Sequence, residues 1–200
     1  MIILLTGEKG SGKSTVAMGL AKRLIQSGIP VGGVICPGIF ELGRKTGIKT
    51  HYPENGHEEI AGSEIPGRNG SLTGQPVPMI TGPDTFSYGR WEFRLSILTA
   101  ADAVIIRDTE AARFVFVDEI GPLELDHGMG MAKTLARLDA DKKINNCSIL
   151  VCARQDLAQT LVERWPESRL VKLAEEGQKD NTSALEYILE TATRWHQSRN

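Results

Sequence analysis

Short apolar runs recur along the chain, separated by longer segments in which apolar residues return every three or four positions. The short runs are typical of buried strands in a parallel sheet, and the longer segments are typical of amphipathic helices. The predicted strands span residues 1–5, 31–36, 113–117, 148–152 and 170–173, and the predicted helices span residues 14–27, 99–110, 128–138, 156–164 and a last segment from about 183. This alternation predicts an α/β fold with a mainly parallel sheet and helices on both of its faces.

Polar and glycine residues mark the ends of several predicted helices. Gly28 ends the first one, because glycine readily adopts the left-handed conformation found just after a helix. Thr99 is predicted to cap the second helix, with Asp102 at its third position. Ser183 and Glu186 form a similar capping pattern at the start of the last helix.

The region from about residue 46 to 89 has a different pattern. It contains five of the nine prolines, scattered glycines and no helical period. We predict hairpins and loops there, with Asn55 and Gly56 forming a tight turn. A disordered insertion is the alternative, but apolar residues such as Ile60 and Val77 favour an ordered one. Residues 1–200 are therefore predicted to form a single domain that carries this Pro/Gly-rich hairpin insertion.

Composition limits the classes of function. The chain has 200 residues, of which 40% are apolar and 24% are charged, and its formal net charge is -2. These values are typical of a globular protein, and the absence of a basic tail or stripe argues against nucleic-acid binding. No apolar run approaches the roughly 20 residues that span a bilayer, and the first ten residues do not resemble a signal peptide. We expect a cytoplasmic protein whose three cysteines are reduced thiols.

A glycine-rich segment follows the first predicted strand and fits the pattern G-x-x-x-x-G-K-[ST] at every fixed position. The backbone N–H groups of such a loop surround phosphate oxygens, and the next helix presents its positive end to them. Lys13 is expected to reach the β- and γ-phosphates, and the Ser14 hydroxyl to bind Mg²⁺. The predicted nucleotide-binding residues are Gly7, Glu8, Lys9, Gly10, Ser11, Gly12, Lys13, Ser14 and Thr15. A chance match is the alternative, but the flanking strand and helix argue for a P-loop that binds a nucleoside triphosphate.

Two carboxylates follow the apolar residues 114–117. In P-loop proteins, an aspartate at the end of such a strand lies beside the loop and holds Mg²⁺. A glutamate directly after it can take a proton from the attacking water. We therefore predict Asp118 as the Mg²⁺ partner together with Ser14, and Glu119 as the catalytic base alongside Lys13. Acidic residues that merely end a strand are the alternative, which the P-loop upstream makes the weaker one.

Residues 117–125, VDEIGPLEL, resemble the Asp-Glu-Ile-Gly-x-x-Glu-Leu signature of a small P-loop nucleoside-triphosphatase family first known from thermophiles. Residues 31–34 and 43–48 resemble that family's Gly-Gly-Phe strand and its Gly-x-Arg-x-Gly-Phe hairpin, with Val34 and Ile48 in place of phenylalanine. The resemblance covers roughly residues 1–175. It implies a RecA-like P-loop core that slowly hydrolyses ATP, GTP and other triphosphates with Mg²⁺.

Two arginines outside the P-loop are further candidates for nucleotide binding. Arg44 and Lys45 lie in a turn bounded by glycines, and the resemblance implies a cation near the γ-phosphate there; a plain surface turn is the alternative. Arg154 follows the end of a strand, at the edge of the sheet where ligands bind, and is a candidate for a phosphate or base contact. The segment 175–181 is a candidate for base recognition.

The sequence therefore predicts a nucleoside-triphosphate phosphohydrolase with broad base specificity. One alternative is a nucleotide-driven switch that acts by binding a partner, since it would need the same P-loop. A nucleoside or nucleotide kinase ranks lower, because no segment typical of adenylate kinases and no arginine-rich lid is present. The preferred base, any protein partner and the oligomeric state are left open by the sequence.

Overall fold

The computed structural model describes residues 1–68, 76–140, 147–173 and 181–197. In these residues a five-stranded parallel sheet is ordered β11-β1-β10-β9-β2. Its strands are β1 (Ile2–Gly7), β2 (Val31–Val34), β9 (Phe114–Ile120), β10 (Ser148–Arg154) and β11 (Arg169–Lys172). The strand predictions are confirmed, with ends displaced by three residues or fewer.

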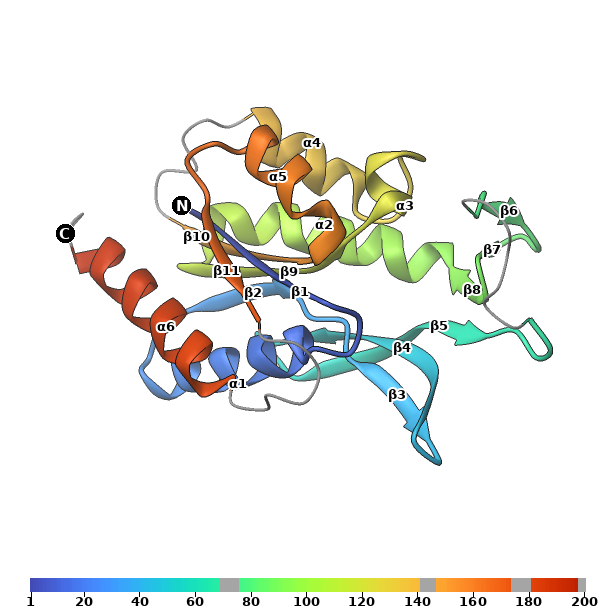
Figure 1. The fold of residues 1–200 in the computed structure, drawn as a ribbon, viewed down its shortest axis with the longest axis horizontal. Coiled ribbons are helices and arrows are strands. Elements are labelled where there is room, and N and C mark those ends of the chain that lie inside the picture. The colour runs from blue at the N-terminus through green and yellow to red at the C-terminus, as the bar shows by residue number, and fades with distance from the viewer. Residues whose placement is uncertain (69–75, 141–146, 174–180, 198–200) are drawn as a thin grey trace.

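Helices cover both faces of the parallel sheet (Figure 1). On one face lie α1 (Lys13–Gln26) and α6 (Thr182–Gln197), which share a buried apolar cluster with that side of the sheet. The other face is covered by α2 (Leu95–Ala111), α4 (Ala132–Ala140) and α5 (Ala158–Arg164). Two short helices, α3 (Pro122–Leu125) and η1 (Gln155–Leu157), follow the ends of β9 and β10. The central strands are therefore buried on both sides, which explains their continuous apolar runs.

A second, antiparallel sheet is inserted between β2 and α2. In the described residues its order is β3-β4-β5-β8-β7-β6. Its strands are β3 (Gly38–Glu41), β4 (Arg44–Tyr52), β5 (His57–Glu64), β6 (Met79–Ile80), β7 (Thr85–Tyr88) and β8 (Trp91–Arg94). The predicted turn is confirmed, because Gly56 has a φ of 74° and its N–H donates to Tyr52 O between β4 and β5. The inserted strands start earlier and end later than the predicted range 46–89.

The start of α2 was predicted wrongly. The helix begins at Leu95 and not after Thr99, because its cap comes from elsewhere in the chain. The Asp84 carboxylate accepts hydrogen bonds from the Ser96 N–H and from the Ser96 hydroxyl, each at 2.7 Å. Asp102 does not serve its own helix. Its carboxylate accepts from the Thr134 N–H at 2.7 Å, so it caps the first turn of α4.

The other helix ends differ less from the predictions. The helix predicted from residue 128 begins at Ala132, because Gly128 and Gly130 have positive φ values of 61° and 65° that no helix accommodates. The last helix begins at Thr182, where its Glu186 contacts Arg23 of α1. Among the described residues, none of the helices combines the length and apolarity that crossing a membrane requires.

Candidate functional site

The glycine-rich loop connects the buried end of β1 to the first turn of α1. Gly10 and Gly12 have φ values of 86° and 91°, a left-handed conformation that glycine adopts at little cost. A Cβ on Gly7 would lie 2.5 Å from Ser11 Oγ, so a side chain there would collide with the folded loop. No side chain caps the first turn of α1, so its backbone N–H groups are directed to the loop that precedes them. The segment has the shape that a phosphate-binding loop requires.

Lys13 is buried within this loop and is 7% exposed. Its ammonium donates hydrogen bonds to Gly7 O at 3.0 Å and to Glu8 O at 3.1 Å. It also lies 3.7 Å from Glu119 Oε1. The loop lysine and the predicted base therefore come together, although about a hundred residues separate them in the sequence.

Asp118 lies at the end of β9 and is 2% exposed. Its Oδ2 accepts a hydrogen bond from the Cys36 N–H at 2.9 Å, which fixes the carboxylate from the segment after β2. The strands β1 and β9 are parallel, and only β10 lies between them. The P-loop after β1 and Asp118 near the end of β9 therefore lie at the same end of the sheet, two strands apart. Ser14, in the first turn of α1, and Asp118 are both suited to Mg²⁺, which binds oxygen ligands and usually takes one or two carboxylates together with substrate phosphates.

Glu119 occupies a bulge in β9. Cys152 pairs with Asp118 and Ala153 pairs with Ile120, so Glu119 is an extra residue in the strand. In a regular strand, neighbouring side chains point to opposite faces, and the bulge interrupts that alternation. Desolvation raises the pKa of Glu119, and the neighbouring Asp118 carboxylate adds to this effect. The cations Lys13, Lys45 and Arg154 act in the opposite direction.

The inserted sheet brings Lys45, and not Arg44, towards these carboxylates. Arg44 has a side chain that is 61% exposed and pairs with Glu64 at 2.9 Å. Lys45 is half-buried; burial lowers the pKa of its ammonium, and the nearby Glu119 and Asp118 carboxylates oppose that change. In the pattern Gly-x-Arg-x-Gly-Phe the arginine precedes the second glycine by two residues, which is the place of Lys45 relative to Gly47. Arg44, the predicted cation, is paired with Glu64 in this structure, and its role stays a prediction.

Two neighbours hold the Lys45 side chain. Its ammonium lies 5.7 Å from the centre of the Trp91 ring, within reach of a cation–π interaction. A Cβ on Gly38 would lie 2.8 Å from Lys45 Cε, so the lysine stem passes over a residue that has no side chain. Gly38 follows Cys36 by two residues, and Cys36 binds Asp118.

Arg154 ends β10 and pairs in register with Gly7, the first residue of the P-loop. Its side chain is 42% exposed and lies 3.5 Å from Asp156. Its charge lowers the pKa values of both Glu119 and Tyr88, opposing the burial that raises them. Arg154 therefore lies at the end of the strand between the P-loop strand and the strand of the acidic pair.

Glu124 is a buried carboxyl that was not predicted as a site residue, although it belongs to the signature after Asp118. Burial raises its pKa to about 7, while hydrogen bonds from the backbone act against this. Its two oxygens accept from the Gly121 N–H at 2.9 Å and the Met131 N–H at 3.3 Å. Glu124 thus ties together the two ends of the loop that follows the acidic pair.

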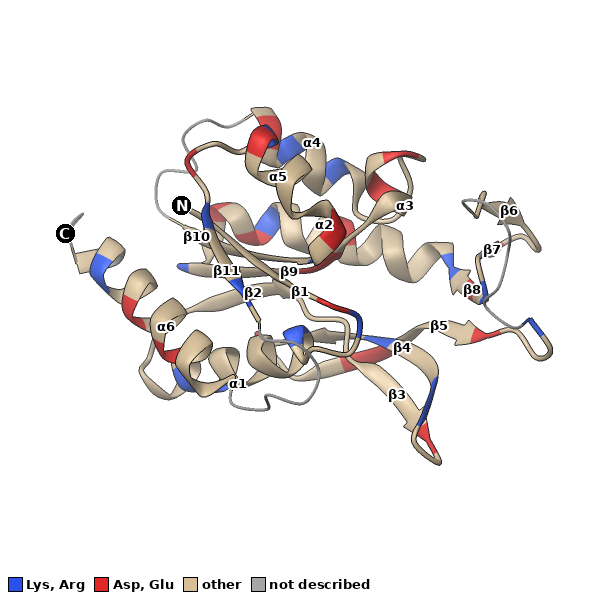
Figure 2. Cartoon of the chain, in the orientation of Figure 1, with Lys and Arg blue, Asp and Glu red and all other residues tan. Residues whose placement is uncertain are grey.

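The segment predicted for base recognition lies mostly outside the described residues, since only Asn181 of 175–181 is described. The Asn181 amide donates a hydrogen bond to Ser11 O at 3.0 Å and so contacts the P-loop directly. The described residues contain no cluster of three or more His, Cys, Asp or Glu side chains that could bind a metal. Basic and acidic residues are mixed along the elements of both the parallel and the inserted sheet and their helices (Figure 2).

Comparisons with known proteins identify the family. A family model described as NTPase matches residues 2–178. The chain is 31% identical over 142 residues to the nucleoside-triphosphatase THEP1 of Thermofilum pendens, covering 70% of this chain and 69% of that protein. It is 26% identical over 179 residues to the THEP1 protein of Methanosarcina acetivorans, covering 89% and 90%.

Two solved structures share the fold. The crystal structure of THEP1 from the hyperthermophile Aquifex aeolicus superposes with a TM-score of 0.65 at 21% identity, over 96% of this chain and 99% of that one. The solution structure of a human cancer-related nucleoside triphosphatase gives a TM-score of 0.64 at 16% identity, over 94% and 95%. At these identities the likeness concerns the fold, including the antiparallel insertion beside the parallel sheet.

Proposed function

The chain belongs to the THEP1 family of P-loop nucleoside-triphosphatases, and we propose that it hydrolyses ATP, GTP and other triphosphates slowly, with Mg²⁺, to the diphosphate and phosphate. The observation that carries this proposal is the meeting of Lys13 with Glu119 at 3.7 Å, beside the buried Asp118. The position of β10 between β1 and β9 also supports the RecA-like class of P-loop core. In this proposal the P-loop binds the phosphates, Asp118 binds the metal and Glu119 is the base, all at the carboxyl end of the parallel sheet.

In the proposed reaction the P-loop binds the phosphates through its backbone N–H groups. Lys13 leaves the carbonyls of Gly7 and Glu8 for the β- and γ-phosphates, which offer it stronger, charged acceptors. Ser14 and Asp118 hold Mg²⁺, which would draw charge from the β- and γ-phosphates when bound. The other loop residues, Lys9 to Gly12 and Thr15, contribute backbone and helix N-terminal contacts.

Glu119 takes the role of general base. When Lys13 turns to the phosphates, the Glu119 carboxylate loses an ionic partner and becomes a better proton acceptor. A raised pKa suits this role, because a base works best when its pKa approaches the working pH. The carboxylate then accepts the proton of the water that attacks the γ-phosphorus.

Two further cations complete the site. Lys45 lies on the side of the inserted sheet, and Arg154 at the end of the strand between Gly7 and Asp118. Each is placed to bind oxygens of the γ-phosphate, where negative charge accumulates in the transition state. Lys45 thereby takes the role that was predicted for Arg44.

A switch that acts through a partner is the second candidate, favoured by one observation. The inserted sheet exposes apolar side chains, among them Phe40 at 65% and Ile80 at 72%. Such side chains can be covered by another protein, and their exposure does not depend on hydrolysis. The switch and the hydrolase differ in whether phosphate is released without a partner.

The test is phosphate release from ATP, GTP, CTP and UTP, with Mg²⁺ or with a chelator, and with or without nucleosides as phosphoryl acceptors. The proposal expects Mg²⁺-dependent phosphate from several triphosphates without any acceptor. Phosphate transferred to an acceptor would replace it with a kinase, and binding without release would replace it with a switch. In Lys13→Ala, binding of a non-hydrolysable triphosphate should weaken at least about tenfold, the effect of losing a charged hydrogen bond.

A further inference from the structure

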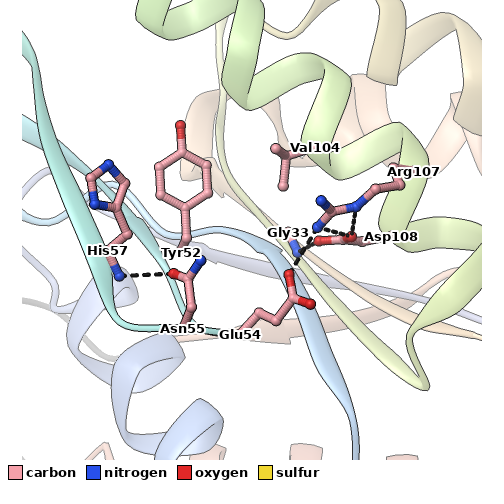
Figure 3. Close-up of a pocket in the computed structure, with 8 residues that line it drawn as sticks. All are labelled: Gly33, Tyr52, Glu54, Asn55, His57, Val104, Arg107 and Asp108. Carbon is pink, nitrogen blue, oxygen red and sulfur yellow. Dashed lines mark hydrogen bonds and ion pairs between the residues drawn. The ribbon is translucent and has the colours of Figure 1, made fainter.

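A pocket of about 200 Å³ lies where the two sheets meet α2. It is lined by Gly33 of β2, by residues of the β4–β5 hairpin and by one side of α2 (Figure 3). The hairpin contributes Tyr52, Glu54, Asn55 and His57, and α2 contributes Val104, Arg107 and Asp108. None of these residues belongs to the site proposed for hydrolysis.

The floor of the pocket depends on the glycine pair of β2. Asp108 is 4% exposed, and its Oδ2 accepts a hydrogen bond from the Gly33 N–H at 2.7 Å. A Cβ on Gly32 would lie 2.6 Å from the Asp108 side chain, and one on Gly33 would lie 2.1 Å from Phe116 O. The proposed hydrolysis does not involve these two glycines. In the pocket, their lack of side chains leaves room for the buried Asp108 carboxylate.

The walls of the pocket differ in character, as Figure 3 shows. On one side the rings of Tyr52 and His57 stack with their centroids 5.7 Å apart and an angle of 25° between their planes. The Tyr52 hydroxyl donates to Glu59 at 3.2 Å, which restrains the buried ring. On the other side lie Val104 and the Arg107 side chain. The space between is suited to a flat ring that has apolar faces and polar edges.

The polar edge of the pocket consists of one guanidinium between two carboxylates. Arg107 donates to Asp108 Oδ1 at 2.7 Å and to Glu54 Oε2 at 2.8 Å. In the described part of the chain, the other oxygen of Glu54 takes part in no hydrogen bond or ion pair. Glu54 and Arg107 are each 57% exposed, so both can also bind a ligand from the open side. The excess of negative charge disfavours phosphate and favours an uncharged ligand that donates hydrogen bonds.

We propose that this junction pocket binds an uncharged purine nucleoside, guanosine, through its base. A carboxylate accepts hydrogen bonds from donors such as the amino group of guanine, and a guanidinium donates to the guanine O6 and N7 atoms. Glu54 and Arg107 supply this pair, and the Tyr52–His57 stack supplies a surface for the ring. The volume is below the range of about 300–1,000 Å³ usual for whole small-molecule ligands, so the base enters and the ribose stays outside.

Calorimetric titration of the intact protein with guanosine tests the proposal. Guanosine should bind saturably, and adenosine, which lacks the 2-amino group and carries an amino group in place of the O6 atom, at least tenfold more weakly. Glu54→Gln keeps the shape but not the acceptor pair, so guanosine affinity should fall at least tenfold while phosphate release from ATP is unchanged. Glu58→Gln is the matched control, because Glu58 contacts Lys49 at 2.8 Å and does not line the pocket. Its guanosine affinity should equal that of the wild type.

A second measurement separates this pocket from the P-loop. A non-hydrolysable ATP analogue at saturating concentration should leave guanosine binding in place, and the NMR signal of the His57 ring should shift on adding guanosine. His57→Ala removes the outer ring of the stack and should weaken binding by a similar factor. Absence of binding at millimolar guanosine, displacement by the ATP analogue, or wild-type affinity in Glu54→Gln would each overturn the proposal.

Discussion

The two sheets differ in how their apolar side chains are covered. Phe116 of β9 and Leu150 of β10 are fully buried, since helices cover both faces of the parallel sheet. Ile60 of β5 is 53% exposed and Met79 of β6 is 60% exposed. The groups that need fixed positions, Lys13, Asp118 and Glu119, come from the covered sheet or the loop after its first strand. The inserted sheet contributes Lys45, whose charge acts on Glu119 and Asp118, so the groups of the proposed site come from both sheets.

The sharpest test of this division is Glu119→Gln, for which we expect hydrolysis to slow by about 10²–10⁴, the usual contribution of a general base. The change keeps the shape of the side chain, so affinity for a non-hydrolysable triphosphate should stay near that of the wild type. Because burial raises the pKa of Glu119, the wild-type rate should fall as pH is lowered through that pKa, above the ordinary value for glutamate. Steady-state phosphate release across pH measures both effects.

Asp118→Asn provides the contrast in the same strand. This variant should lose Mg²⁺-dependent binding as well as rate, because Asp118 is proposed to hold the metal. If Glu119→Gln hydrolyses at the wild-type rate, Glu119 is not the base. If both variants lose affinity equally, the two carboxylates do not have separate roles.

Stability should also differ between the two sheets. Phe116→Ala removes a fully buried ring from the parallel sheet and should lower the free energy of unfolding by about 3–5 kcal/mol. Ile60→Ala removes a half-exposed side chain from the inserted sheet and should cost about 1 kcal/mol or less. Chemical denaturation of the two variants gives both values. Equal losses would mean that the inserted sheet is as tightly packed as the parallel one.

Glu124, in the short helix α3 after β9, should make stability depend on pH. Its pKa is raised to about 7 in the folded protein, so the folded state holds this proton more tightly than the unfolded chain does. Its contribution to stability is therefore complete below the unfolded pKa and is lost as pH rises through 7, by about 3 kcal/mol at most. Glu124→Gln does not titrate. Chemical denaturation at pH 5 and pH 8 gives the free energy of unfolding of both proteins. The value for Glu124→Gln should rise relative to the wild-type value between pH 5 and pH 8, and an unchanged difference would contradict this.

Among the proposed site residues, the smallest effect on hydrolysis is expected at Lys45. Lys45→Met keeps most of the stem beside Trp91 and removes the charge, which should slow hydrolysis by about 10–100-fold, the range for one charged hydrogen bond. Arg44→Met is the matched control on the neighbouring residue, whose partner is Glu64, and should leave the rate near the wild-type value. A larger loss of hydrolysis rate in Arg44→Met than in Lys45→Met would mean that Arg44, and not Lys45, is the cation that binds the γ-phosphate. Phosphate release under saturating ATP makes the comparison.

The sequence predicted well those features that depend on local pattern. The strands of the parallel sheet are continuous apolar runs because both faces are buried, and the P-loop has fixed spacing because its glycines need left-handed backbone. Asp118 and Glu119 were predicted as site residues because they directly follow such a run, and the structure brings Glu119 to 3.7 Å from Lys13. The family resemblance was confirmed, and the positions of the strands followed from the apolar pattern.

Features that depend on distant partners could not be predicted. An apolar run shows that a strand is buried and not which strands are its neighbours, so the place of β10 between β1 and β9 had no local signal. The start of α2 is capped by Asp84, and Asp102 caps another helix, so neither cap could be assigned by spacing. Lys45 and Arg44 are neighbouring cations in one turn; the glycine spacing of the family pattern aligns Lys45 with its arginine, and the fold shows how their surroundings differ. Glu124 looks like any helical glutamate until its burial is known.

The pairing of strands has a consequence for the order of folding. In the inserted sheet, Tyr52 pairs with His57 across a short turn, so this hairpin closes a small loop. In the parallel sheet, Ile2 pairs with Ile149, so β1 meets its neighbour only after most of the chain has been made. Long-range parallel pairing is slow because the entropy of loop closure is lost before the contacts form. During synthesis the P-loop sequence emerges early but lacks the strand beside it, so triphosphate binding should be acquired late and would report completed folding of the nascent chain.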